Sequence, residues 1–208
     1  MIPVMALERA TFSVTESDLE FMVLEKKELP DGFHGHEVVR EGTLDNESMA
    51  QHGFATSTAA RFRKAGRVLG FMKEFGPPSS MAAPDGFDFL AATVAHLFDK
   101  PDSVIGWMHN IFLKDFEDNI GQCIGEGHQL ISARRLQPKS FFDEAVGIKV
   151  LQDGPSGLVS STVIDFRVGR ILGVAFVGTV GDHERLDLAT ELGLALEKRI
   201  VKVVLGGG

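Results

Sequence analysis

Two histidines, two positions apart, are the first residues whose spacing could do chemistry. His34 and His36 fall within residues 33–40, a polar stretch that predicts an edge strand. Alternate side chains of a strand project from one face, and two imidazoles on one face is a spacing that metal sites use. A third ligand would have to come from elsewhere, and the candidates are Asp31, Glu41, His52 and His109. An exposed pair without metal is the simpler interpretation, because only two ligands are specified.

Cys123 is the single cysteine of the chain, so no intramolecular disulfide can form. His128 follows five positions later, across a glycine-rich turn, and could serve as a base for the thiol. No third group that would orient such a pair is identifiable in the sequence. We therefore predict a buried cysteine with a structural role.

Three carboxylates crowd the end of a predicted helix: Asp115, Glu117 and Asp118. Paired carboxylates do acid and base chemistry when burial separates their pKa values. Here they fall on the side of the helix that should face water, which favours a solvated acidic surface.

Glycines interrupt the most apolar stretch of the chain, residues 171–180, at Gly173 and Gly178. A glycine inside a strand leaves a gap that a ring, a backbone or a ligand can approach. Packing of Trp107 or of a helix against this gap is one interpretation. A small apolar pocket with Trp107, Gly173 and Gly178 as ligand-binding residues is the other.

Motifs that carry catalysis or cofactors do not occur. The glycines of residues 121–127 lack the order and the following lysine of a phosphate loop, and no serine has the Gly-x-Ser-x-Gly context of an esterase. The sequence therefore predicts no catalytic residues and no cofactor, and we expect a protein that is not an enzyme.

Composition indicates a globular chain with a real core. Of 208 residues, 44% are hydrophobic and 24% are charged. We expect an amino-terminal arm over residues 1–28 and one domain over residues 29–208, with the loop 76–86 as an alternative boundary. The net charge of -8 repels phosphate backbones, which argues against a nucleic-acid partner.

Membrane and export signals are also lacking. The apolar stretch 171–180 is far shorter than the roughly 20 residues that span a bilayer, so no transmembrane segment is expected. Residues 1–7 lack the basic start of a leader peptide, and a secreted protein without its leader would look the same.

Periodicity predicts an α+β fold. Apolar residues recur at helical spacing over residues 101–119, and a second amphipathic helix covers residues 183–205 with Asp182 as its N-cap. Between them, strands at 128–136, 145–151, 158–168 and 170–180 are separated by short turns. Sequential strands joined by short turns pair antiparallel. We therefore predict a mainly antiparallel sheet packed by these two long helices.

A family resemblance becomes visible in that order of elements. The segments LPDGF at 29–33, GRVLGF at 66–71 and FRVGRILGV at 166–174, followed by Asp182 and a helix, resemble bacterial extracytoplasmic domains of unassigned function. Those domains are similar in layout to PsbP-like α/β/α sandwiches. The resemblance covers the chain from Leu29 and implies a secreted or lipid-anchored protein that binds something. The chain departs from a lipoprotein in lacking an amino-terminal lipobox cysteine.

Three functions follow as hypotheses. The first is a noncatalytic extracytoplasmic domain that binds a small molecule or a protein partner, although a cytoplasmic location stays open. The second is a small metal-dependent enzyme that uses His34 and His36. The third is an oligomerising structural protein, a homodimer, because the carboxy-terminal helix is apolar on more than one side, at Leu194, Val201 and Val204.

Overall fold

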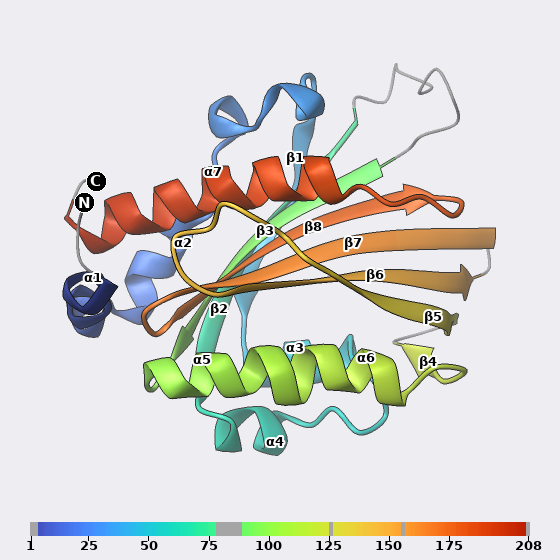
Figure 1. Ribbon diagram of the computed structural model, residues 1–208, viewed down its shortest axis with the longest axis horizontal. Helices are drawn as coiled ribbons and strands as arrows, with labels where there is room; N and C mark the ends of the chain where they lie inside the picture. The colour runs from blue at the N-terminus through green and yellow to red at the C-terminus, as the bar shows by residue number, and fades with distance from the viewer. Residues whose placement is uncertain (1–3, 78–88, 125–126, 155–156, 207–208) are drawn as a thin grey trace.

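A computed structural model describes residues 4–77, 89–124, 127–154 and 157–206 of the chain. Its centre is a curled eight-stranded sheet with the order β1-β2-β3-β8-β7-β6-β5-β4, in which every neighbouring pair is antiparallel (Figure 1). The strands are β1 Glu37–Leu44, β2 Arg67–Gly76, β3 Phe89–Phe98, β4 Cys123–Ile124, β5 His128–Leu136, β6 Ala145–Gly154, β7 Gly157–Val168 and β8 Ile171–Val180. The prediction of an antiparallel sheet in an α+β fold is confirmed.

Helices cover both faces of the sheet (Figure 1). The first face carries α1 Val4–Ala10, α2 Leu19–Met22 and α7 Leu186–Val204, with 3-10 turns at Thr11–Ser13, Glu16–Asp18, Lys26–Glu28 and Asp31–Phe33 near them in the chain. The second face carries α3 Asn46–Gln51, α4 Ala59–Lys64, α5 Pro101–Trp107, the π-helical segment Met108–Leu113 and α6 Lys114–Asp118. The molecule therefore has three layers.

Strand alternation divides the core between these layers. On β7, Ile164 and Phe166 pack toward α7, whereas Val163 packs toward the helices of the second face. β3 lies between β2 and β8 in the middle of the sheet. Its continuous apolar sequence suits a strand that is covered on both faces.

The helix predicted over residues 101–119 is not one uninterrupted α-helix. Pro101 begins it in the first turn, as expected for a residue whose missing N–H would be unpaired there. Residues Met108–Leu113 then form a π-helical segment before α6 completes the element. π segments are rare and often accompany functional sites.

The carboxy-terminal helix begins at Leu186 rather than at residue 183, and Asp182 is not its N-cap. The Asp182 carboxylate pairs instead with Lys149. The backbone N–H groups of His183 and Arg185 donate to the hydroxyls of Ser160 and Thr162 on β7. These bonds hold residues 183–185 against the strand, so the helix starts one turn later than predicted.

The strand expected at residues 33–40 begins later, at Glu37, and continues to Leu44. Phe33 ends a 3-10 turn, and Gly35 adopts a φ of 86°, which favours glycine. This turn separates His34 from the strand. The predicted loop 76–86 lies outside the described residues from residue 78 onward.

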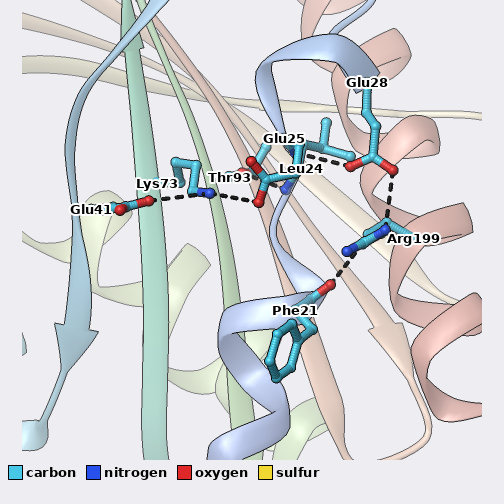
Figure 2. A network of polar contacts seen from close by, with 8 residues as sticks. All are labelled: Phe21, Leu24, Glu25, Glu28, Glu41, Lys73, Thr93 and Arg199. Atoms are coloured by element: carbon cyan, nitrogen blue, oxygen red, sulfur yellow. Dashed lines mark hydrogen bonds and ion pairs between the residues drawn. The ribbon is translucent and has the colours of Figure 1, made fainter. Parts of the chain in front are cut away.

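Residues 4–28, the described part of the expected arm 1–28, contribute Leu19, Met22 and other apolar side chains to the core beneath α7. Polar contacts also hold this segment against α7 and the sheet (Figure 2). Arg199 of α7 donates to the carbonyl of Phe21 and pairs with Glu28. The N–H of Leu24 donates to Thr93 Oγ1 on β3. Whether the segment is a separate unit from residues 29–208 stays a prediction.

Lys73 of β2 is the buried cation of this network (Figure 2). Its ammonium lies 2.8 Å from Glu25 and 3.1 Å from Glu41. Burial lowers the pKa of Lys73, but the hydrogen bonds to both carboxylates outweigh burial and leave that pKa raised. The charged form is therefore retained, and the amino-terminal segment is held to the sheet.

Candidate functional site

A cavity of about 440 Å³ lies between the second face of the sheet and the helices α3 to α6. Its volume falls in the range of small-molecule sites. Strands β2, β3, β6, β7 and β8 form the floor with Met72, Glu74, Leu90, Ala92, Val94, His96, Val150, Gln152, Ser161, Val163, Asp165, Val174 and Phe176. Most of these side chains are apolar, so the cavity suits a ligand with a large apolar part.

Aromatic side chains form much of the cover, which we call the aromatic roof: Phe54, Phe62, Trp107, Phe112 and Phe116. The rings contact one another in tilted and edge-on pairs, with centroids 5.1 Å apart for Phe62 and Trp107 and 5.4 Å apart for Phe54 and Phe116. Such pairs prefer these geometries because the ring edge is positive and the face negative. Phe112 belongs to the π-helical segment, which thus contributes directly to the cavity wall.

An ion pair joins the two sides of the roof. Arg61 of α4 donates two hydrogen bonds, of 2.6 and 2.7 Å, to the carboxylate of Asp115 on α6. The hydrogen bonds raise the pKa of Arg61. A bidentate pair fixes geometry as well as charge, so it holds α4 beside α6 at the cavity.

Asp165 is a buried carboxyl in the floor of the cavity. It lies on β7 between Val174 of β8 and Val146 of β6, and its side chain is 1% exposed. Its Oδ2 has no hydrogen-bond partner among the described residues. Burial raises the pKa of Asp165 well above its usual range. The protonated form is therefore favoured, and this form offers an O–H donor.

His96 of β3 is the second polar group of the floor. Its Nδ1 lies 3.0 Å from Nη2 of the buried Arg67, which also donates to Asn46 Oδ1 and to the carbonyl of Leu44. Burial, together with the positive charge of Arg67, lowers the pKa of His96 well below its usual range. Burial also lowers the pKa of Arg67 to about 10, so its guanidinium stays charged at neutral pH.

The backbone makes room for this contact at Gly70 of β2, which pairs with His96 across the strands. A Cβ at Gly70 would lie 2.2 Å from His96 Nδ1 and 2.8 Å from Arg67 Nη2. No side chain fits at that distance. Glycine is therefore required where the imidazole and the guanidinium meet.

The residues predicted to bind a ligand lie on different faces of the sheet. Trp107 lines the cavity. The gap at Gly173 lies on the first face, beneath α7, and the ring of Phe166 fills it. A Cβ added at Gly173 would lie 2.2 Å from this ring. Gly178 pairs with Ser161 and Leu90, which line the cavity, and Phe176 lies 3.0 Å from its would-be Cβ. Ligand binding by these residues stays a prediction.

The predicted metal ligands His34 and His36 differ in exposure. His34 is exposed in the turn before β1, and His36 is buried at 4% exposure. Within residues 4–77, 89–124, 127–154 and 157–206, no three histidine, cysteine or acidic residues are grouped as a metal site would require. A metal at this pair therefore stays a prediction that needs a ligand from elsewhere.

Cys123 is exposed on the short strand β4, so the prediction of a buried cysteine is wrong. The reason is its place at the edge of the sheet, where the two-residue strand β4 pairs Cys123 with Gln129 and Ile124 with His128.

The three acidic residues near the end of α6 have separate cationic partners. Glu117 pairs with Arg135, Asp118 pairs with Lys114, and Asp115 pairs with Arg61. The predicted acidic surface is thereby neutralised locally. Asp115 is only 15% exposed and lines the cavity, so it does not lie on the wet side as expected.

Sequence reasoning missed the polar floor of the cavity. His96 and Asp165 each sit inside an apolar strand, at positions whose alternation points into the core. A charged or polar residue at such a position departs from the pattern of a buried strand. That departure was the signal that could have identified both residues.

Comparison with known proteins supports the fold and no family. No protein-family model matches the sequence, and no curated protein sequence matches it. The extracellular domain of PknH from Mycobacterium tuberculosis is similar in structure, with a TM-score of 0.61 and 10% identity, over 91% of this chain and 97% of that domain.

A protein from Mycobacterium smegmatis, described as the Rv0999 ortholog, aligns over 79% of this chain and 90% of its own with 10% identity. Its TM-score is 0.42, too low to support an argument. The similarity to the PknH domain therefore shows the fold, and the PsbP-like layout is not confirmed. No helix in the described part of the chain combines the length and apolarity needed to cross a membrane.

Proposed function

We propose that this protein is a noncatalytic extracytoplasmic domain that binds a small molecule with a large apolar part and a polar group in the cavity between the sheet and α3 to α6. The observation that carries the proposal is Asp165, whose carboxyl lies in the cavity floor with an unpartnered Oδ2. Buried polar groups in folded proteins are nearly always hydrogen-bonded. A ligand that enters the cavity supplies the missing partner.

The remaining features of the cavity support binding rather than catalysis. The aromatic roof and the apolar floor remove a ligand from water, which is the main source of affinity for apolar molecules. No nucleophile with an adjacent base lies among the described lining residues. The similarity to the PknH extracellular domain supports an extracytoplasmic location. A homodimer stays a prediction, which light scattering tests.

Binding is tested with a substitution that fills the cavity. Val94 lines the floor, and Val94→Phe places a ring where the ligand would lie. The matched control is Val68→Phe on β2, whose side chain is 37% exposed and outside the cavity. Both variants are incubated with a bacterial lipid extract and examined by native mass spectrometry.

We expect a bound small molecule on the wild type and on Val68→Phe, and none on Val94→Phe. Equal loading of Val94→Phe would place the ligand elsewhere. A wild type that takes up nothing from the extract, and gains no thermal stability from long-chain alcohols or acids, would refute the proposal, because a bound ligand must stabilise the folded state.

A further inference from the structure

Among the described residues near the cavity, the acidic groups of the rim are paired with cations, and one buried cation has no carboxylate in contact with it. Glu74 accepts two hydrogen bonds from Arg40, at 2.8 and 2.6 Å, and Asp115 is paired with Arg61 in the same bidentate manner. His52, an exposed residue that also lines the cavity, contacts the carbonyl of Ser48 through Nδ1. The acidic groups of the rim are therefore already neutralised.

Arg67 is that cation. It is 1% exposed, and its side-chain partners are the neutral groups of Asn46, Leu44 and His96. Asp45, the carboxylate that acts on it through space, is exposed and accepts a hydrogen bond from Ser48. A buried charge is stabilised when a counter-charge shares its low-dielectric surroundings. No carboxylate of the described residues is in contact with Arg67.

His96 connects Arg67 to the cavity. A guanidinium only donates hydrogen bonds, so Nδ1 of His96 must accept the bond from Arg67. The neutral imidazole then carries its proton on Nε2. Nε2 makes no hydrogen bond with the described residues, and the ring lines the cavity. The cavity thus holds an N–H donor that is polarised from behind by a positive charge.

We infer that the ligand is a long-chain carboxylate, whose anionic head accepts a hydrogen bond from Nε2 of His96 while its hydrocarbon chain lies under the aromatic roof. This inference rests on the proposed function and names the ligand class of the same cavity. The head would provide the counter-charge that Arg67 lacks. Burial favours the neutral form of Asp165, and this form adds no negative charge that would repel the head.

The energetic balance favours an acid over its uncharged analogues. Burying a carboxylate is costly unless it is paired and hydrogen-bonded. Here the guanidinium is already buried and the imidazole donor is already positioned in the folded protein. Binding therefore requires little further free energy to organise the site. A hydrogen bond to a charged group then corresponds to about tenfold to a hundredfold in affinity.

The test compares four probes of equal chain length, each below its micellar concentration: laurate, dodecanol, methyl laurate and dodecylamine. Trp107 reports binding directly, because the chain has 1 Trp and 0 Tyr and this residue is part of the aromatic roof. A laurate brominated on its chain quenches Trp107 only if the chain reaches the roof. Val94→Phe controls for binding outside the cavity.

We expect the wild type to bind laurate about tenfold or more tightly than dodecanol or methyl laurate, with dodecylamine weakest. His96→Leu should lose this preference while its affinity for dodecanol persists. His96→Gln, which can accept from Arg67 and donate to the ligand, should restore part of it. The brominated chain should quench Trp107 in the wild type and not in Val94→Phe.

Two results would overturn the inference in different ways. Equal affinity of the wild type for laurate and dodecanol would show that the site does not recognise an anion, while the proposed function would stand. If none of the four probes binds, both the inference and the proposed function are wrong. The head-group comparison is made on the wild type, so it decides even if His96→Leu fails to fold.

Discussion

Replacing Asp165 with asparagine tests whether the cavity floor carries a protonated carboxyl. Asparagine has nearly the shape of the protonated acid, but its amide does not ionise. The side chain is 1% exposed and burial raises its pKa well above the usual range. The substitution therefore removes an ionisation from the folded state and leaves the packing of β7 almost unchanged.

The magnitude follows from proton linkage. Between the pKa of an unfolded aspartate, about 3.9, and the raised pKa of folded Asp165, the unfolded chain has lost its proton and the folded protein still holds it. The stabilising contribution of Asp165 is complete below the lower value and is lost as pH rises. In that window the wild type loses about 1.4 kcal/mol of unfolding free energy per pH unit relative to Asp165→Asn.

Urea denaturation followed by Trp107 fluorescence measures the difference, at about pH 4.5, 5.5 and 6.5. His96 has the opposite pH dependence. Its pKa is lowered in the folded protein, so its contribution to the free energy of unfolding decreases as pH falls below the usual histidine pKa. Both proteins keep His96, so its contribution cancels in the comparison. Asp153→Asn, an exposed position on β6, is the matched control.

The expected result is a free-energy difference between wild type and Asp165→Asn that grows with pH in favour of the variant. Asp153→Asn should show no such trend. A difference that stays constant over the whole range would mean that Asp165 is ionised in the folded protein. The account of the cavity floor would then be wrong.

Further predictions concern the roof, the backbone and the metal alternative. Asp115→Ala should lower the unfolding free energy by about 1 kcal/mol in urea titrations, because it breaks a partly exposed bidentate pair; an unchanged midpoint would contradict a role in holding α4 to α6. Gly70→Ala should lower the unfolding free energy by about 2 kcal/mol, because its Cβ would overlap His96. Gly106→Ala in α5, where an added Cβ would meet no atom within 4 Å, should raise the unfolding free energy by about 1 kcal/mol or less. Elemental analysis of protein purified without a histidine tag should find no stoichiometric metal, and a metal lost in His34→Ala would instead favour the enzyme hypothesis.

Several elements could be read from the sequence because their signals are local. Alternation and turn residues predicted the strands from His128 onward, and the observed strands β5 to β8 overlap those predictions. The helix α3 also has a local signal, because the Asp45 side chain accepts a hydrogen bond from the N–H of Ser48 as an N-cap does. The same local signals misplaced the start of β1, which follows a 3-10 turn and the positive φ of Gly35. They also misplaced the start of α7, where the hydroxyls of Ser160 and Thr162 hold the backbone.

What the sequence by itself determined is the set of elements and their antiparallel order, since periodicity and turn chemistry act between near neighbours in the chain. Only the tertiary structure decided that β3 pairs with β8, which carries His96 and Asp165 into one cavity from strands far apart in the sequence. It also decided that Arg67 is buried behind His96, where no carboxylate of the described residues contacts it. Burial and electrostatic pairing depend on which distant surfaces meet, and no spacing within one segment encodes that.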